Sequence, residues 1–224
     1  MYGAGRTDVE FEGVLERLKE EGSSLLVVGD VPGEAYARAS RRMFGDDDHA
    51  PRQRVLVVGG GARTTLPSRV REPRRRDSDT VITHGTNARR AVADAGVTPD
   101  ITPRAHVAAG DTNVLGRAVL ETIASLDGEF APGELRLGVD TLQTLLDTAG
   151  EFPTFRTVDL LSERVRRERG MAHFRLPKPR SDQHVRLLEP LFDAVVELRV
   201  TDGVEQRWSL RDEDVVSEWV SLDA

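Results

Sequence analysis

Short, uninterrupted aliphatic runs that end at glycine constrain the fold of this chain more than any other feature. The run Leu25–Val28 ends at Gly29, and the run Val55–Val58 ends at Gly59. A continuous apolar run is typical of a strand that is buried on both faces of a parallel sheet. We predict further strands at 80–82, 135–139 and 172–176.

Amphipathic helices are predicted between these strands. The segment 8–21 carries apolar residues at the i, i+3, i+4, i+7 spacing of one helix face, and Gly22 can end it. We predict further helices at about 34–44, 112–126, 141–149, 154–169 and 182–191. Alternating strands and helices predict an α/β fold, with a mostly parallel sheet covered by helices on both faces. No internal boundary is evident, so we expect a single domain over 1–224.

The pattern changes near the C-terminus to strict alternation of apolar and polar residues. Two such segments, 196–200 and 204–210, flank the dipeptide Asp202-Gly203. This arrangement predicts an antiparallel hairpin with a two-residue type I′ turn at the end of the sheet. A tail from about residue 212 is expected to add a short element around Val215, Val216 and Trp219.

Two stretches have no clear periodicity. Residues 60–80 read as an irregular exposed segment with the basic run 69–76, and prolines leave 94–106 ambiguous. The basic run could bind a polyanion, but no aromatic residue is interleaved for base stacking. We interpret it as a solvated loop, with a DNA-associated regulator as an alternative.

Composition limits the possible chemistry and compartment. The chain has no cysteine, which excludes disulfides, cysteine-ligated zinc and thiol catalysis. The five histidines lack metal-ligand spacing, so no metal site is predicted. No apolar run approaches the roughly 20 residues of a membrane span. The N-terminus has no signal-peptide pattern. We therefore expect a cytoplasmic protein without a membrane contact.

The charged residues are strongly biased. Lys and Arg total 31 against 38 Asp and Glu, for a net charge of −7, and the lysines are Lys19 and Lys178 alone. An acidic surface argues against general nucleic-acid binding. The bias resembles that of cytoplasmic proteins of salt-loving archaea; a mesophilic actinobacterial origin is the alternative.

The order of the segments is similar to that of a known fold. Residues 22–29, GSSLLVVG, lie where RecA/KaiC-like ATPases have the strand before their phosphate loop. Residues 135–142, LRLGVDTL, resemble the Walker B strand, and 170–174 resemble the strand after it. The resemblance covers roughly residues 10–211. It points to an uncharacterised haloarchaeal group of RecA/KaiC-like proteins that have lost their ATPase motifs.

The residues that would bind a triphosphate are missing. A phosphate loop reads G-x-x-x-x-G-K-[ST]. Here the second glycine, Gly33, arrives one residue early, and Glu34 follows it instead of lysine. The resemblance marks vestigial nucleotide-site positions at Gly29, Asp30, Gly33 and Asp140.

Asp140 also has a structural interpretation. It can cap the following helix, with Gln143 completing a capping box. We predict no catalytic residue and no cofactor.

These observations favour a non-catalytic RecA/KaiC-like protein over an enzyme. We expect a regulatory or protein-interaction role, with an unidentified protein partner or further copies of the chain. The alternative is a nucleotide- or dinucleotide-binding enzyme that uses the glycine-rich loop 59–61. That loop departs from the dinucleotide fingerprint, because Thr64 stands where the last glycine should be.

Overall fold

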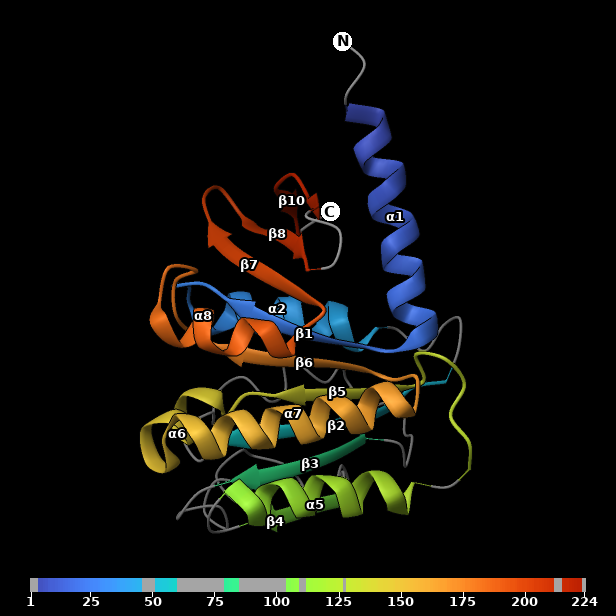
Figure 1. Cartoon of the computed structure of the whole chain (residues 1–224), viewed down its shortest axis with the longest axis vertical. Coiled ribbons are helices and arrows are strands. Elements are labelled where there is room, and N and C mark those ends of the chain that lie inside the picture. The colour runs from blue at the N-terminus through green and yellow to red at the C-terminus, as the bar shows by residue number, and fades with distance from the viewer. Residues whose placement is uncertain are drawn as a thin grey trace.

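The computed structural model describes residues 4–45, 51–59, 79–84, 104–108, 112–126, 128–211 and 215–222. Its strands form one ten-stranded sheet in the order β10-β8-β7-β1-β6-β5-β2-β3-β4, with β9 paired to β8 (Figure 1). The strands are β1 Ser23–Val28, β2 Gln53–Gly59, β3 Asp79–His84, β4 Arg104–Ala108, β5 Leu135–Val139, β6 Met171–Leu176, β7 Ala194–Val200, β8 Val204–Leu210, β9 Val215–Val216 and β10 Val220–Ser221. The helices are α1 Ala4–Glu21, α2 Gly33–Phe44, α5 Thr112–Ser125, α6 Leu142–Ala149, α7 Glu151–Arg167, α8 Gln183–Leu188 and the 3-10 turn η1 Glu189–Leu191.

The centre of the sheet is parallel and one end is antiparallel. β1 pairs in parallel with β6 and β7, and β5 pairs in parallel with β6 and β2. β3 and β4 continue the parallel part. β8 then runs antiparallel to β7, and the short strands β9 and β10 pair with its other edge. The predicted fold class, a mostly parallel sheet with a C-terminal hairpin, is confirmed.

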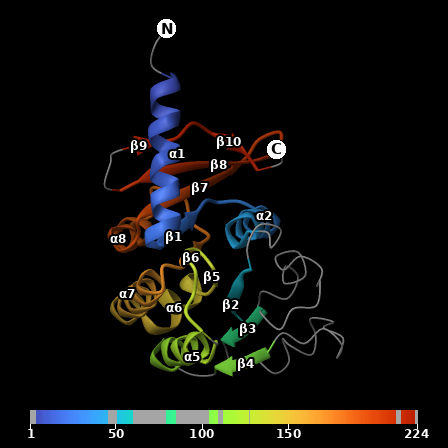
Figure 2. The same cartoon turned by 90° about the vertical axis from the view of Figure 1, so that its right-hand side faces the viewer.

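Helices cover both faces because the central strands bury both sets of side chains. Leu26 and Val28 of β1 join a cluster with α5, α6, α7 and α8. Leu25 and Val27 join a second cluster that includes residues of α1 and α2. Figure 2 shows α5, α6 and α7 on one side of the sheet and α2 on the other.

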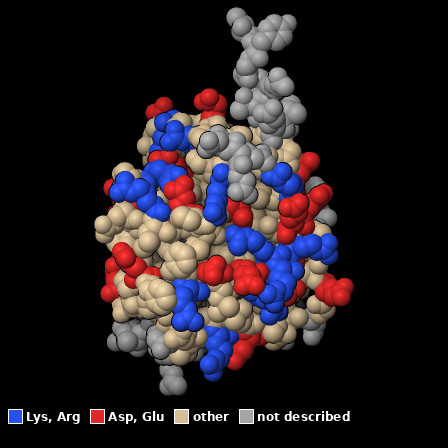
Figure 3. Space-filling view, in the orientation of Figure 1, with Lys and Arg blue, Asp and Glu red and all other residues tan. Residues whose placement is uncertain are grey.

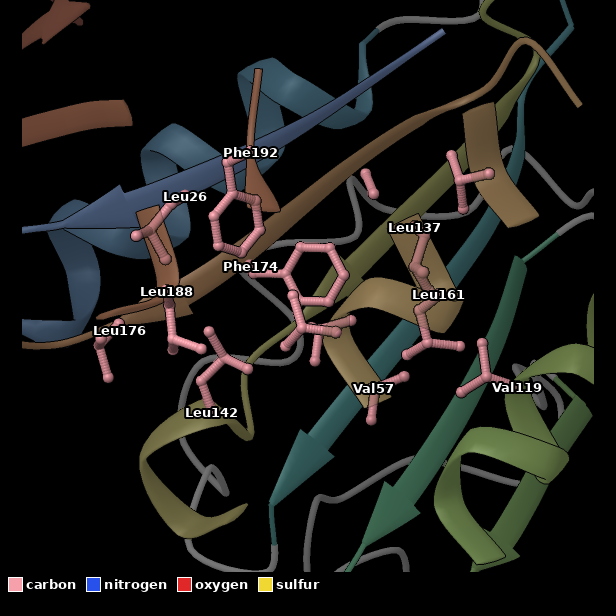
Figure 4. Close-up of a cluster of buried hydrophobic side chains, with 14 of the residues drawn as sticks. Leu26, Val57, Val119, Leu137, Leu142, Leu161, Phe174, Leu176, Leu188 and Phe192 are labelled. Atoms are coloured by element: carbon pink, nitrogen blue, oxygen red, sulfur yellow. The ribbon is translucent and has the colours of Figure 1, made fainter. Parts of the chain in front are cut away.

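The larger cluster is the main hydrophobic core. Phe174 of β6 lies in it with no exposed surface, and its ring centroid is 5.3 Å from that of Phe192 (Figure 4). Leu137 of β5 and Leu161 of α7 extend the same cluster. This packing fixes α7 against the strands that lead to the carboxyl edge of the sheet.

Helix α2 sits unusually close to the sheet at Gly138. A Cβ atom at this position would lie 2.6 Å from the ring of Phe44 and 2.9 Å from the ring of His173, so only glycine fits. The two rings meet edge to face at 4.8 Å. Ser40 Oγ and His173 Nε2 are hydrogen-bonded at 2.8 Å. The buried histidine of β6 therefore anchors α2.

The predicted type I′ turn is wrong. Val200 pairs with Val204, so the loop has three residues, and neither Asp202 nor Gly203 has a positive φ. A two-residue loop would shift the pairing by one residue. Such a shift would move the charged side chains of one strand onto the apolar face of the other. The observed register keeps Leu198 opposite Gln206 on the buried side.

The remaining sequence predictions concern the segments 60–80 and 94–106 and the C-terminal tail. Strand β4 was missed because the prolines of 94–106 hid its start. Residues 60–78, with most of the predicted irregular basic segment, lie outside the described residues, whereas residues 79 and 80 belong to β3. The short tail element is confirmed as β9. Among the described helices, none is long and apolar enough to cross a membrane.

We expect Phe174→Ala to lower the free energy of unfolding by about 3–5 kcal/mol, because it leaves a cavity in the main core. Phe152→Ala is the matched control, since that ring is 71% exposed on α7. Urea unfolding followed by circular dichroism measures both. Equal losses for the two variants would contradict this assignment of the core.

Candidate functional site

The site lies where the connections from two neighbouring strands diverge. β1 continues through α2, which packs on one face of the sheet, whereas β6 continues through α8 on the opposite face. β1 and β6 are adjacent and parallel. In open α/β sheets, ligands bind outside the carboxyl ends of strands at such a switch point.

A tyrosine side chain joins the two strand ends at this point. The hydroxyl of Tyr36, in the first turn of α2, donates to the carbonyl oxygen of Gly29 at 2.6 Å. It also lies 3.3 Å from the carbonyl oxygen of Leu176 at the end of β6. Tyr36 is only 2% exposed. The position between β1 and β6 is therefore bridged by a buried side chain of the protein itself.

Gly29 is fixed on every side. Its N–H donates to the carbonyl oxygen of Lys178 at 2.8 Å, and its own carbonyl accepts from Tyr36. Its φ of +145° and the carbonyl oxygen of Leu198, 2.5 Å from a hypothetical Cβ, exclude any larger residue. The backbone groups of Gly29 thus bond within the protein.

Arg175 and Asp140 extend this arrangement along the carboxyl edge. The guanidinium of Arg175 lies over the Tyr36 ring, 4.4 Å from its centroid. An ion pair joins Arg175 Nη1 to Asp140 Oδ2 at 3.7 Å. The Asp140 side chain is 3% exposed and the Arg175 side chain 22% exposed. A cation on an aromatic face with a carboxylate partner is a favourable way to place a partly buried charge.

Burial dominates the titration of these side chains. Desolvation raises the pKa of Tyr36 well above the value of a free tyrosine, although nearby Arg175 opposes the shift. Desolvation lowers the pKa of Arg175. Tyr36 therefore stays protonated, as its donated hydrogen bond requires.

The turn from β1 to α2 carries negative side chains. Asp30 and Glu34 are exposed, and Glu34 lies in the first turn of α2, which begins at Gly33. A carboxylate at a helix N-terminus is stabilised by the helix dipole. These two carboxylates would repel a phosphate at the same place.

The vestigial positions predicted from the sequence come partly together. Gly29, Asp30 and Gly33 form the turn between β1 and α2. Asp140 follows β5 and connects to this region through Arg175. Whether these positions descend from a nucleotide site stays a prediction.

The predicted capping role of Asp140 is wrong. Helix α6 begins at Leu142 with Thr141, rather than Asp140, as its N-cap, and the Thr141 side chain makes no capping hydrogen bond. The Gln143 side chain instead donates to Asp147, one helical turn further on. One oxygen of the Asp140 carboxylate lies within ion-pair distance of the Arg175 guanidinium.

The glycine-rich loop 59–61 and the basic run 69–76 add little to the description of this site. Gly59 ends β2, whereas Gly60 and Gly61 lie outside the described residues, as does the basic run 69–76. Over the residues whose placement is known, no group of three or more His, Asp or Glu side chains could hold a metal ion.

Sequence reasoning missed Tyr36 and Arg175, the two residues that organise the site. Arg175 is a charged residue inside the predicted buried strand 172–176, and that was the available signal. No sequence signal pointed to Tyr36, because a single aromatic residue is common in an amphipathic helix.

Comparison with solved structures defines the class of protein. A KaiC-like protein from the hyperthermophilic archaeon Pyrococcus horikoshii OT3 superposes with a TM-score of 0.50 at 13% identity, over 88% of this chain and 83% of that chain. Another Pyrococcus horikoshii OT3 protein, PH0250, gives a TM-score of 0.57 at 17% identity, over 94% of this chain and 97% of that chain. The chain therefore has a RecA/KaiC-like fold.

The sequence also places the chain in a family. Residues 22–198 match the family described as "Family of unknown function (DUF7504)", and the chain belongs to it. The matched region runs from just before β1 into β7 and contains Tyr36, Arg175 and Asp140. Comparison with curated proteins gave no match.

We expect Tyr36→Phe to cost about 1–2 kcal/mol of stability near neutral pH, because the Gly29 carbonyl loses its buried donor. The loss should shrink with alkali. The folded pKa of Tyr36 is raised, so its stabilisation is complete below the unfolded pKa of about 10 and declines as pH rises above it.

Near pH 11 the two proteins should differ by about 1.4 kcal/mol less than at neutral pH. Urea unfolding at a series of pH values measures this difference. A constant difference across the series would show that the Tyr36 hydroxyl is not held protonated by burial.

Proposed function

We propose that this chain is a non-catalytic RecA/KaiC-like protein that acts through protein contacts, in regulation or as an interaction module. The observation that carries the proposal is the buried Tyr36 hydroxyl, which bridges the ends of β1 and β6 where a nucleotide site would be expected. A ligand placed between these strand ends would have to displace the buried Tyr36 side chain.

Charge at the turn supports the proposal. Phosphates bind helix N-termini through free N–H groups and a favourable dipole, usually with a lysine close by. Here Glu34 takes the place of that lysine, and Asp30 adds a second carboxylate. Two like charges ~4 Å apart repel by about 1 kcal/mol in water and about 4 kcal/mol near a protein surface.

In the proposed function, an arginine rather than a metal ion balances the charge of the Asp140 carboxylate. Its carboxylate pairs with Arg175, a fixed cation on the neighbouring strand β6. An aspartate that ligates Mg²⁺ in an ATPase works together with a hydroxyl of the phosphate loop. Ala35 stands one residue after Glu34, where that hydroxyl would be, so the site lacks this group too.

The face that carries α7 and α8 is compatible with protein partners rather than nucleic acid. On the face with α7 and α8, Lys and Arg alternate with Asp and Glu instead of forming one basic field (Figure 3). Pairs such as Arg164–Glu168 and Arg167–Glu163 account for this mixing on α7. With the acidic, arginine-rich composition, this supports a role in the cytoplasm of a salt-loving archaeon.

We expect Asp140→Asn to destabilise the protein by about 1–3 kcal/mol, because Arg175 loses its charged partner. Neither the unaltered chain nor this variant should hydrolyse ATP. Thermal denaturation and phosphate release with ATP and Mg²⁺ in high-potassium buffer measure the two effects. Asp159→Asn, on the exposed face of α7, is the matched control and should be neutral in both assays.

Two outcomes would contradict the proposal. One is ATP hydrolysis by the unaltered chain that Asp140→Asn abolishes. The other is a nucleotide-dependent rise in melting temperature with ATP, GTP, NAD or NADP, because a ligand at 100 times its Kd adds about 2.7 kcal/mol of stability.

A further inference from the structure

The chain covers one edge of its own sheet with a short C-terminal segment. We name residues Val215–Leu222 the C-terminal strap. β9 and β10 lie within it and pair with opposite ends of β8. The uncovered edge of a long strand is a template for pairing with another chain, and proteins commonly block it.

The C-terminal strap engages β8 along its whole length. Ser217 N donates to the carbonyl oxygen of Trp208 at 2.8 Å, and Ser217 Oγ accepts from Trp208 N at 2.9 Å. At the other end, Leu222 N donates to the carbonyl oxygen of Val204 at 2.7 Å. The even-numbered residues of β8 therefore direct their backbone groups at the strap.

Trp219 fastens the C-terminal strap to the hairpin. Its ring lies under two guanidinium groups, with Arg199 at 4.0 Å and Arg207 at 4.6 Å from the centroid. Each arginine also pairs with a glutamate across the hairpin, Arg199 with Glu205 and Arg207 with Glu197. The ring thus rests on a charged surface.

The attachment is small compared with the edge that it covers. β9 and β10 have two residues each, whereas β8 has seven. Val216 is 52% exposed and Val220 45% exposed, so these two side chains gain little from burial, whereas Val215 and Leu222 are half-buried against the smaller apolar cluster. Segments with few buried contacts open at lower free energy than the rest of a fold.

The edge of β8 is complementary to itself. Two copies of β8 can pair antiparallel about a two-fold axis at Gln206. Glu205 of each copy then faces Arg207 of the other, and Val204 faces Trp208. Opposite charges on facing strands stabilise a sheet, whereas like charges destabilise it. Moving the axis to Arg207 would bring two arginines together, so the axis at Gln206 is the favoured one.

We propose that the C-terminal strap blocks self-association, and that its release lets two copies of this chain pair through their β8 edges into one continuous sheet. The proposal rests on the proposed role in protein contacts and names the partner as a second copy. The outward backbone groups of Val204, Gln206 and Trp208, now bonded to the strap, would bond across the two-fold axis instead. The Glu205 and Arg207 side chains would set the register.

The test uses the full chain with the C-terminal strap loosened by Ser217→Pro and Trp219→Ala. The first change removes the donor and the acceptor that meet Trp208, and the second removes the ring between the arginines. The matched control is Val216→Ala with Glu218→Ala, at two exposed positions of the strap. Light scattering should give the loosened variant twice the molar mass of the unaltered chain, and the control the same mass as the unaltered chain.

Cross-linking tests the register, because the chain has no cysteine of its own. In the loosened variant, Gln206→Cys should form a disulfide-linked dimer, since residues in a hydrogen-bonded antiparallel pair have Cα atoms about 5.5 Å apart. Ser209→Cys should not, because the two copies of that residue would lie about 20 Å apart.

An unchanged mass for the loosened variant, with its circular dichroism spectrum intact, would overturn the proposal. So would equal cross-linking at both cysteine positions. If the loosened variant unfolds, the single change Trp219→Ala is the test instead, because it keeps the backbone hydrogen bonds of the strap. This variant should show a higher dimer fraction than the unaltered chain at high protein concentration. Nucleotide turnover tests the proposed function and does not test this inference. The molar mass of the loosened variant tests this inference and does not test the proposed function.

Discussion

The side chains of β1 alternate between two apolar clusters, so helices must cover both faces of the sheet. This requirement sends α2 to one face and α8 to the other, and the connections from β1 and β6 diverge at the carboxyl edge. A polar gap at that edge would expose the ends of two buried strands. Tyr36 closes it from within α2, with its hydroxyl bonded to Gly29 and within reach of Leu176. The position of the site thus follows from double-sided burial.

Closing the gap with a tyrosine changes the electrostatics of its neighbours. Arg175 stacks on the Tyr36 ring and needs a counter-charge, which the carboxylate of Asp140 supplies from the next strand. In a nucleotide-binding relative of the fold, charges at the carboxyl edge are balanced by phosphates and a metal ion. In the proposed function they are balanced by each other, so the edge is complete without a ligand.

Much of the fold could be predicted because burial leaves a pattern in the sequence. The runs Leu25–Val28 and Val55–Val58 are continuous because both faces of their strands are covered. Contacts between distant segments leave no such pattern. Nothing near Asp140 in the sequence indicates that Arg175 is its partner, so the local pattern favours a capping role instead. The predicted turn type is wrong for the same reason, because the register of the confirmed hairpin is set by packing across both strands rather than by Asp202-Gly203.

An internally completed site also changes what stability depends on. A protein whose cleft needs a nucleotide gains stability only when the nucleotide is present, in proportion to its concentration relative to the Kd. Tyr36, Arg175 and Asp140 are part of the chain, so their contribution to stability does not depend on any metabolite. Because the sheet is stabilised in this way, the residues at exposed positions can vary, including those of the edge strand β8 and of the exposed face of α7. If the proposed function holds, selection would act on what those surfaces contact.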